Sequence, residues 1–315
     1  MTGAAVVWND LSTQAVDVAF FAYLAAMVGS FHFLAFRRPL VRRVSLAVTV
    51  LGAGSHLVAL VARGIAADRL PVGNMYEYSL LLTFLVVLAY LVGVERIARV
   101  TTLGGFVLAF VVLTLAVAVV FLYVGPAPLV PALDSYWRTV HVTAMIVSSS
   151  LLALGSVVTI LYLWQERRER RASGAPAPIM GGSIGVEDAP PHFEVDAVRA
   201  GHGSVSAGRF PSAAALDALA SRILSFAFPL WTFGVISGAI WAEDAWGRYW
   251  GWDPKETWSF ITWTVFAGYL HARTTSGWRG RRAAVIALVG FVSLLITYYA
   301  VNLWIVGLHS YAGVS

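Results

Sequence analysis

Eight apolar stretches of about 20 residues recur along this chain, and they constrain its fold more than any other feature. An α-helix of about 20 residues is long enough to cross a hydrocarbon core of roughly 30 Å. The chain is 58% hydrophobic and 12% charged, with a mean hydropathy of +0.73. We therefore predict an all-α, polytopic integral membrane helix bundle with about eight transmembrane helices. The stretches lie at 15–36, 44–63, 75–94, 103–124, 139–164, 222–241, 256–273 and 283–306.

The distribution of Lys and Arg predicts how these helices are oriented. When alternate loops are assigned to opposite sides of the membrane, 17 of the 22 basic residues fall on one side. Basic residues collect in cytoplasmic loops, so that side is predicted to face the cytoplasm and both termini to face outward. The net charge of +5 is then a topology signal, and no nucleic-acid binding is expected. The five remaining basic residues are Arg63, Arg69, Arg138, Arg248 and Lys255.

The apolar stretches divide the chain into three parts. Residues 1–164 are predicted to form a five-helix membrane segment, and residues 222–315 a three-helix membrane segment. Residues 165–221 are charged at first and then rich in Gly, Ala and Pro, a composition typical of a flexible cytoplasmic linker. The chain contains no cysteine, so any sulfur chemistry must use the sulfur of a partner.

Tryptophan is concentrated in one predicted outer loop, residues 241–258, which we call the tryptophan loop. Its segment WGRYWGWDPKETW (246–258) holds four Trp in 13 positions. Trp and Tyr favour membrane interfaces at all helix ends, which explains one or two of these residues but not their concentration. A dense aromatic surface suits a large planar ligand whose faces can be stacked. We therefore expect a ligand site at this loop.

The charged residues of the loop have structural interpretations beside the functional one. Asp253, Pro254 and Glu256 carry the pattern of a helix capping box, so Asp253 could act only as the first residue of the next helix. Arg248 and Lys255 either hold the carboxylates of an amphiphilic planar ligand or extend their charges to the membrane interface.

Four histidines are candidate ligands of a haem iron, for which neutral imidazole is a common axial ligand. His141 lies in the first turn of the fifth stretch and His309 follows the eighth, so topology places both on the same face as the tryptophan loop. Two imidazoles above and below an aromatic slot would ligate one iron. His56 and His271 lie within predicted spans and form a candidate second pair. Their depths below the outer surface differ, at roughly 10 and 22 Å when about 1.5 Å is counted per residue.

Several segments together resemble a known family. WGRYWGWDPKETWSFITW is similar to the tryptophan-rich WWD signature of haem-handling proteins. YWRTVHVTAM and NLWIVGLHSYA resemble the flanking-histidine segments of the CcsA branch, also called ResC, of the System II cytochrome c synthase. NMYEYSLL (74–81) and HARTTSGWRGRRAA (271–284) also resemble segments of that branch.

The resemblance implies roles for individual residues. His141 and His309 would be the outer axial ligands of haem b, and His56 and His271 an inner, intramembrane haem site. Arg248 and Lys255 would contact the haem carboxylates, and Glu77 would be a functional residue of its segment. The implied haem platform consists of Trp246, Gly247, Tyr249, Trp250, Gly251, Trp252, Asp253 and Trp258.

The function implied is that of a haem transport and presentation subunit of a cytochrome c synthase. Such a subunit delivers haem outward and aids thioether attachment to the C-x-x-C-H motif of apocytochrome c. The expected location is the cytoplasmic membrane, with the active face outward. The expected partners are a CcsB/ResB-type membrane protein, apocytochrome c and a thiol-reducing membrane protein. Two alternatives stay open: a haem exporter that serves a chaperone, and a non-enzymatic assembly scaffold.

Overall fold

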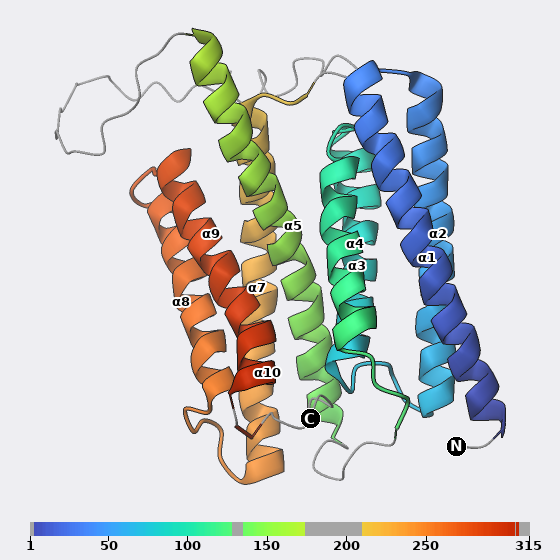
Figure 1. Ribbon diagram of the computed structural model, residues 1–315. Helices are drawn as coiled ribbons and strands as arrows, with labels where there is room; N and C mark the ends of the chain where they lie inside the picture. The colour runs from blue at the N-terminus through green and yellow to red at the C-terminus, as the bar shows by residue number, and fades with distance from the viewer. Residues whose placement is uncertain (1–2, 128–134, 174–209, 306, 309–315) are drawn as a thin grey trace.

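The protein is a bundle of long helices in this computed structural model, which describes residues 3–127, 135–173, 210–305 and 307–308 (Figure 1). No strand occurs in these ranges. The predicted all-α polytopic fold is therefore confirmed. The helices are α1 (Gly3–Phe36), α2 (Pro39–Ala67), α3 (Met75–Ala89), α4 (Gly104–Phe121), α5 (Tyr136–Ser173), α7 (Ala213–Trp246), α8 (Pro254–Thr274), α9 (Arg281–Leu295) and α10 (Val301–Trp304).

Two helices continue through π-helical turns, which changes the direction of the side chains that follow. α3 runs into a π-helix at Tyr90–Ile97, and α9 is joined to α10 by a π-helix at Ile296–Ala300. Among the described residues, seven helical segments are long and apolar enough to span a membrane. The seventh predicted stretch forms α8, which has 21 residues but a more polar composition and is not one of the seven.

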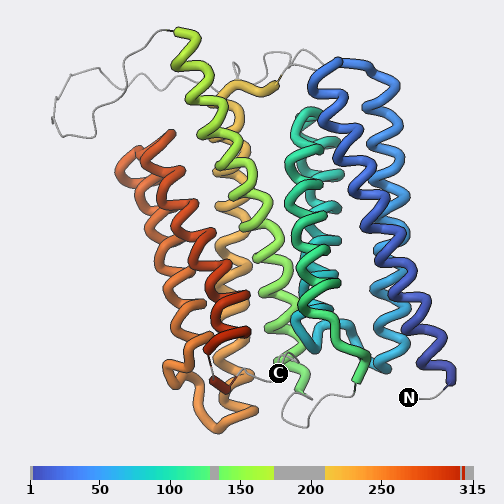
Figure 2. The backbone as a smooth tube through the Cα atoms, viewed as in Figure 1, coloured from blue at the N-terminus to red at the C-terminus, as the bar shows by residue number. Residues whose placement is uncertain are grey.

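The two groups of helices form one bundle (Figures 1 and 2). α1 packs on α2 and α4, whereas α8 packs on α9. α5 packs along α7 and also contacts α3 and α9, so it joins the N-terminal helices to the C-terminal ones. The turn between α7 and α8 lies at the same end of the bundle as the start of α1, at the bottom of Figure 1.

Both ends of the predicted linker, residues 165–221, are helical in the structure, because α5 extends to Ser173 and α7 begins at Ala213. The charged end of α5 stays helical because its side chains pair one turn apart. Gln165 donates a hydrogen bond to Glu169 at 2.9 Å, and Arg170 lies 2.8 Å from Glu166. Residues 174–209 lie outside the described part of the chain.

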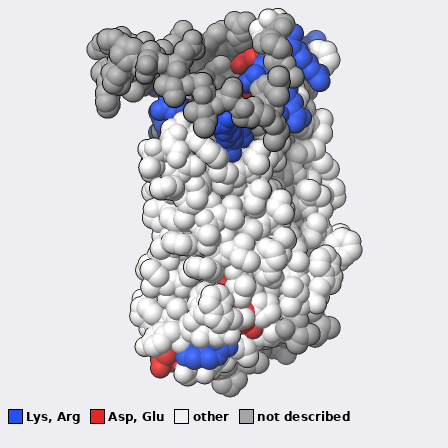
Figure 3. Space-filling model, turned by 90° about the vertical axis from the view of Figure 1, so that its left-hand side faces the viewer, with Lys and Arg blue, Asp and Glu red and all other residues white. Residues whose placement is uncertain are grey.

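Charge is distributed unevenly along the bundle axis. On the face seen in Figure 3, Lys and Arg gather mainly at the upper end, and a band of uncharged residues separates that end from a smaller charged group at the lower end. The uncharged band agrees with burial of the helices in a lipid bilayer.

Candidate functional site

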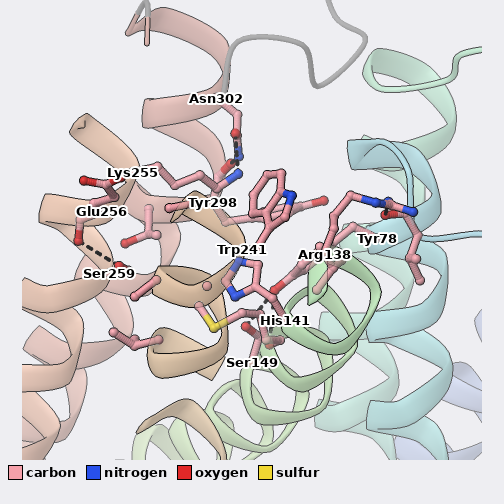
Figure 4. A pocket seen from close by; sticks show the side chains of 18 of the residues that line it. Tyr78, Arg138, His141, Ser149, Trp241, Lys255, Glu256, Ser259, Tyr298 and Asn302 are labelled. Atoms are coloured by element: carbon pink, nitrogen blue, oxygen red, sulfur yellow. Dashed lines mark hydrogen bonds between the residues drawn. The ribbon is translucent and has the colours of Figure 1, made fainter. Parts of the chain in front are cut away.

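One large pocket opens among α3, α5, α7, α8 and the α9–α10 segment, at the end of the bundle that carries the tryptophan loop (Figure 4). It encloses about 1170 Å³ of empty space, including space open to solvent. We call it the aromatic pocket, because its walls include Trp231, Trp241, Trp246, Tyr249 and Trp250.

His141 lies in the wall of the aromatic pocket, where α5 packs against α7. Its Nδ1 lies 2.7 Å from the carbonyl oxygen of Gly234. Its ring stacks on Trp241 at a centroid distance of 5.9 Å. Gly238 permits this arrangement, because a Cβ at that position would come within 2.6 Å of the imidazole. The small residues Gly234 and Gly238, four positions apart, thus let α5 and α7 approach closely.

The tryptophan loop contributes only part of its aromatic residues to the pocket. Trp246, Tyr249 and Trp250 line it, as the sequence led us to expect. The indole nitrogen of Trp250 is buried and has no hydrogen-bond partner among the described residues. Trp252 does not line the pocket: it is 65% exposed and adopts a left-handed backbone conformation with φ of 59°. The other predicted platform residues that do not line the pocket are Gly247, Gly251, Asp253 and Trp258.

Two cationic side chains line the aromatic pocket, and only one was among the predicted carboxylate contacts. The Lys255 Nζ donates to Asn302 Oδ1 at 2.7 Å. Burial lowers the pKa of Lys255 to about 8, an effect that the charge of Asp253 opposes. Arg138, which is only 6% exposed, donates to the carbonyl oxygen of Val72. Arg248 is not a pocket residue and instead faces Glu256 at 3.8 Å.

Arg138 could have been found from the sequence, because it lies three positions before His141 and therefore on the same face of α5. No comparable spacing in the sequence indicated that Tyr78 and Tyr298 would line the pocket. Their rings stack at a centroid distance of 4.8 Å across the α3 and α9–α10 helices, and both line the pocket. Tyr78 bonds to Ser149 at 2.8 Å, and Tyr298 donates to the carbonyl oxygen of Met75 at 2.8 Å. These bonds close one side of the pocket.

The predicted capping box at the start of α8 is confirmed. Asp253 accepts a hydrogen bond from the backbone of Lys255, and Glu256 accepts one from the backbone of Asp253 at 3.1 Å. Glu256 also accepts from the Gly251 amide at 2.8 Å. The carboxylates of the loop therefore fix its backbone and the first turn of α8.

Glu77 lies at the centre of a buried ion-pair network beside the pocket. Its carboxylate accepts from Arg63 at 3.0 Å, from Arg69 at 2.7 Å and from the Gly73 amide at 2.8 Å. Glu77 and Arg63 are almost fully buried. The network fixes the segment between α2 and α3, whose Gly73 and Asn74 line the aromatic pocket.

The structure does not bring His56 and His271 together. His56 is buried in α2, with its Nδ1 3.4 Å from the Tyr23 hydroxyl and its ring against Phe84. His271 is exposed in the last turn of α8. Helices α2 and α8 lie at opposite edges of the bundle, with α5 and α7 between them (Figure 1). His309 lies outside the described residues.

This geometry defines a class: a multi-pass helical membrane protein with an aromatic, histidine-containing pocket at one end of the bundle. Comparison with known families identifies the particular one, since the model of the cytochrome C assembly protein family matches residues 72–309. The chain belongs to the CcsA family of cytochrome c biogenesis proteins, as the resemblance in sequence had indicated.

Two relatives agree with that assignment, and one solved structure has a similar fold. CcsA of Gloeobacter violaceus is 40% identical over 95% of both chains, and CcsA of Synechocystis is 36% identical over 94% of this chain and 96% of the relative. The fold is similar to that of the cytochrome c heme lyase CcmF, with a TM-score of 0.64 and 15% sequence identity. The match covers 95% of this chain and 47% of CcmF, so this chain spans about half the length of that protein.

Proposed function

We propose that this protein carries haem outward across the membrane and presents it to an apocytochrome c, as the haem-handling subunit of a cytochrome c synthase. The observation that carries the proposal is the position of His141 within the aromatic pocket, beside the tryptophan loop. Aromatic walls suit the flat faces of a porphyrin, and an imidazole suits its iron. The proposed cargo is haem b, with His141 and His309 as its axial ligands.

The cations of the pocket support a cargo that carries carboxylates. Arg138 and Lys255 lie on opposite sides of Trp241 in Figure 4. A buried cation is stabilised by an anionic partner that it can bind directly. We therefore assign the two haem carboxylates to Arg138 and Lys255, and Arg248 no longer has this role.

The chemistry proposed for the synthase is the addition of two cysteine thiols to the two vinyl groups of haem. In each addition a carbon–sulfur bond forms, the vinyl double bond becomes a single bond, and the thiol hydrogen ends on the other vinyl carbon. The sulfur comes from the C-x-x-C-H motif of the apocytochrome, because this chain has no cysteine. The residues of the pocket hold the cargo in one orientation, which raises its effective concentration toward the thiols.

Three further parts of the proposal concern location and partners. The larger basic group at the end of the bundle opposite the tryptophan loop supports an orientation in the cytoplasmic membrane with the aromatic pocket facing outward (Figure 3). The thiols of the apocytochrome must be reduced, which calls for a thiol-reducing membrane protein. A CcsB/ResB-type membrane protein is the proposed partner in the synthase.

The experiment that tests the proposal is purification of the protein with its partner, followed by an absorption spectrum and an assay for covalent attachment of haem to an apocytochrome. We expect a bis-histidine haem spectrum and a covalent product, and we expect His141→Ala to lose both. Bound haem without a covalent product would favour the haem exporter. The proposal is wrong if the complex binds no haem when haem is supplied, a result that favours the assembly scaffold.

A further inference from the structure

Lys255 is the only lysine of this chain, and every other Lys-or-Arg position holds an arginine. A lysine differs from an arginine in that its charge is concentrated on one nitrogen and can be lost. Lys255 lines the aromatic pocket, and so does Asn302, from α10. The Lys255 Nζ donates to the Asn302 Oδ1 at 2.7 Å (Figure 4). The one lysine of the chain is therefore held at the pocket by an amide.

The side chain of Asn302 is fixed in one orientation. Its Nδ2 donates to the carbonyl oxygen of Tyr298, in the π-helix that precedes α10. A carbonyl oxygen can only accept a hydrogen bond, and an ammonium group can only donate one. Nδ2 must therefore face Tyr298, and Oδ1 must face Lys255. Tyr298 itself stacks on Tyr78 in the pocket wall, so the acceptor for Lys255 is attached to a packed part of the pocket.

The acceptor that Asn302 offers is neutral, so it does not cancel the charge of Lys255. Among the described residues, Asn302 is the only hydrogen-bond partner of the Lys255 Nζ. An ammonium group has three N–H donors, and two of them remain for a ligand. An aspartate at position 302 would have nearly the same size, but its charge would neutralise the ammonium. The amide thus holds the cation in place and leaves its charge available.

We propose that Asn302 is a specificity-determining residue, which positions the ammonium of Lys255 through a neutral acceptor and so keeps its charge free for a carboxylate of the cargo. This inference rests on the proposed function, which assigns one haem carboxylate to Lys255. Hydrogen bonds between ionised groups are roughly twice as strong as neutral ones. A lysine that is held before the cargo arrives also loses less side-chain entropy on binding. The pocket therefore prefers a porphyrin with free carboxylates to one whose carboxylates are esterified.

Two variants change the acceptor at position 302 in different ways. Asn302→Asp places a negative charge beside the ammonium, and this internal ion pair competes with the carboxylate of the cargo. Asn302→Leu keeps a similar size but has no acceptor, so the ammonium loses its fixed position. A double variant with Lys255→Met and Asn302→Leu tests whether Asn302 acts through Lys255. The second change should then cause no further loss of affinity.

The first measurement is the affinity for iron-free protoporphyrin and for its dimethyl ester at pH 7, followed by fluorescence. Neither probe contains iron, so ligation by histidine does not contribute. We expect both single variants at position 302 to bind protoporphyrin about tenfold more weakly than the wild type, because a hydrogen bond to a charged group is lost or weakened. Both should bind the dimethyl ester as tightly as the wild type does. The ester is thus the matched control for an intact pocket.

The second measurement is acetylation of the Lys255 amine in the ligand-free protein, followed by mass spectrometry as a function of pH. Burial lowers the pKa of Lys255 to about 8, an effect that Asp253 opposes. The midpoint of acetylation should be higher in Asn302→Asp, where a negative acceptor favours the charged amine, and lower in Asn302→Leu. The other ionisable groups around Lys255 are the same in all three proteins. Among the described residues they are Tyr78, Arg138, His141, Tyr249, Asp253, Glu256 and Tyr298.

The outcomes separate this inference from the proposed function. If the wild type binds neither porphyrin, the proposed function fails and this inference fails with it. If the wild type binds protoporphyrin and Asn302→Asp binds it equally well, the specificity role is wrong while the proposed function stands. Equal midpoints of acetylation in the three proteins would overturn the contact itself. Loss of ester binding in both variants would mean that Asn302 only maintains the fold, which also contradicts the proposal.

Discussion

The Nδ1 of His141 lies 2.7 Å from the carbonyl oxygen of Gly234, on the neighbouring helix. A carbonyl oxygen can only accept a hydrogen bond, so Nδ1 must carry the proton in this contact. The unprotonated nitrogen of the neutral ring is then Nε2, the atom that can coordinate a metal. A backbone contact of this kind is a common way to fix the tautomer and orientation of a ligating histidine. The packing of α5 on α7 therefore supports the axial role proposed for His141.

The first prediction is that Gly238→Ala impairs haem ligation by His141. The new Cβ would stand 2.6 Å from the ring, so the imidazole must turn away and lose its bond to Gly234. We expect loss of the bis-histidine absorption spectrum, with partial recovery when imidazole is added. Gly54→Ala is the matched control, since its Cβ meets no atom within 4 Å and it should behave as wild type. A normal spectrum in Gly238→Ala would contradict this role of the helix contact.

The second prediction separates two tryptophans of the same loop. Trp250 lines the aromatic pocket, whereas Trp252 is 65% exposed and does not. Trp250→Ala should weaken haem binding by about 2 kcal/mol, roughly thirtyfold, because an aromatic contact surface is lost. Trp252→Ala should change haem affinity less than about threefold. Titration of each purified variant with haem measures both values, and equal losses would show that Trp252 reaches the cargo.

The tryptophan loop and His141 could be predicted to lie together because both conclusions need only topology. Alternation of spans assigns each helix end to one side of the membrane, and this places His141 on the same face as the loop. Local patterns were equally informative: the capping box at Asp253 and Glu256 is a property of four consecutive residues.

The lateral order of the helices could not be predicted in this way. Topology gives the depth of a residue in the membrane but not its lateral neighbours. A second histidine pair, His56 and His271, was therefore a possible prediction, although α2 and α8 lie at opposite edges of the bundle. The stacking of Tyr78 on Tyr298 likewise depends on which helices pack together and on the π-helical turn before α10. Such contacts follow from side-chain packing between segments far apart in sequence, as at Gly234 and Gly238.

The third prediction concerns the ion-pair network of Glu77. In Glu77→Gln the side chain loses its charge and turns amide hydrogens toward Arg63 or Arg69. Arg63 is 1% exposed, so its guanidinium would be buried without its counter-charge. Removing one partner of a buried pair costs about 3–5 kcal/mol. We therefore expect a clearly lower melting temperature in detergent and a disturbed pocket wall at Gly73 and Asn74.

The control for this prediction is Arg170→Gln. Arg170 pairs with Glu166 one turn apart in α5, and its side chain is 42% exposed. Such exposed pairs contribute less than about 1 kcal/mol, so the melting temperature should change little. Similar melting temperatures for Glu77→Gln and wild type would mean that the network does not stabilise this end of the bundle.

The last prediction is that binding of a dicarboxylate porphyrin weakens as the pH rises through about 8. Lys255 lies in the first turn of α8, outside the seven spanning segments, and burial lowers its pKa to about 8. Below that pH the folded protein carries the charge that a carboxylate needs, and above it the charge is lost. The stability of the ligand-free protein depends on pH in the opposite direction. The unfolded chain binds the Lys255 proton more tightly than the folded chain does, so the free energy of unfolding increases as the pH rises above 8. Among the described residues, the titratable and charged groups that line the pocket with Lys255 are Tyr78, Arg138, His141, Tyr249, Glu256 and Tyr298, and Asp253 lies two positions before Lys255 in the chain.

Iron-free protoporphyrin is the probe for this prediction, because it has the carboxylates of haem but cannot be ligated by a histidine. Its affinity for the wild type, followed by fluorescence, should fall between pH 7 and pH 9. Lys255→Arg should bind with little change over the same range, because a guanidinium stays charged. Lys255→Met should bind weakly throughout, with an affinity near that of the wild type at pH 9. A wild-type affinity that is constant from pH 7 to pH 9 would mean that Lys255 does not contact a carboxylate of the cargo, and would leave Arg138 as the cation that does.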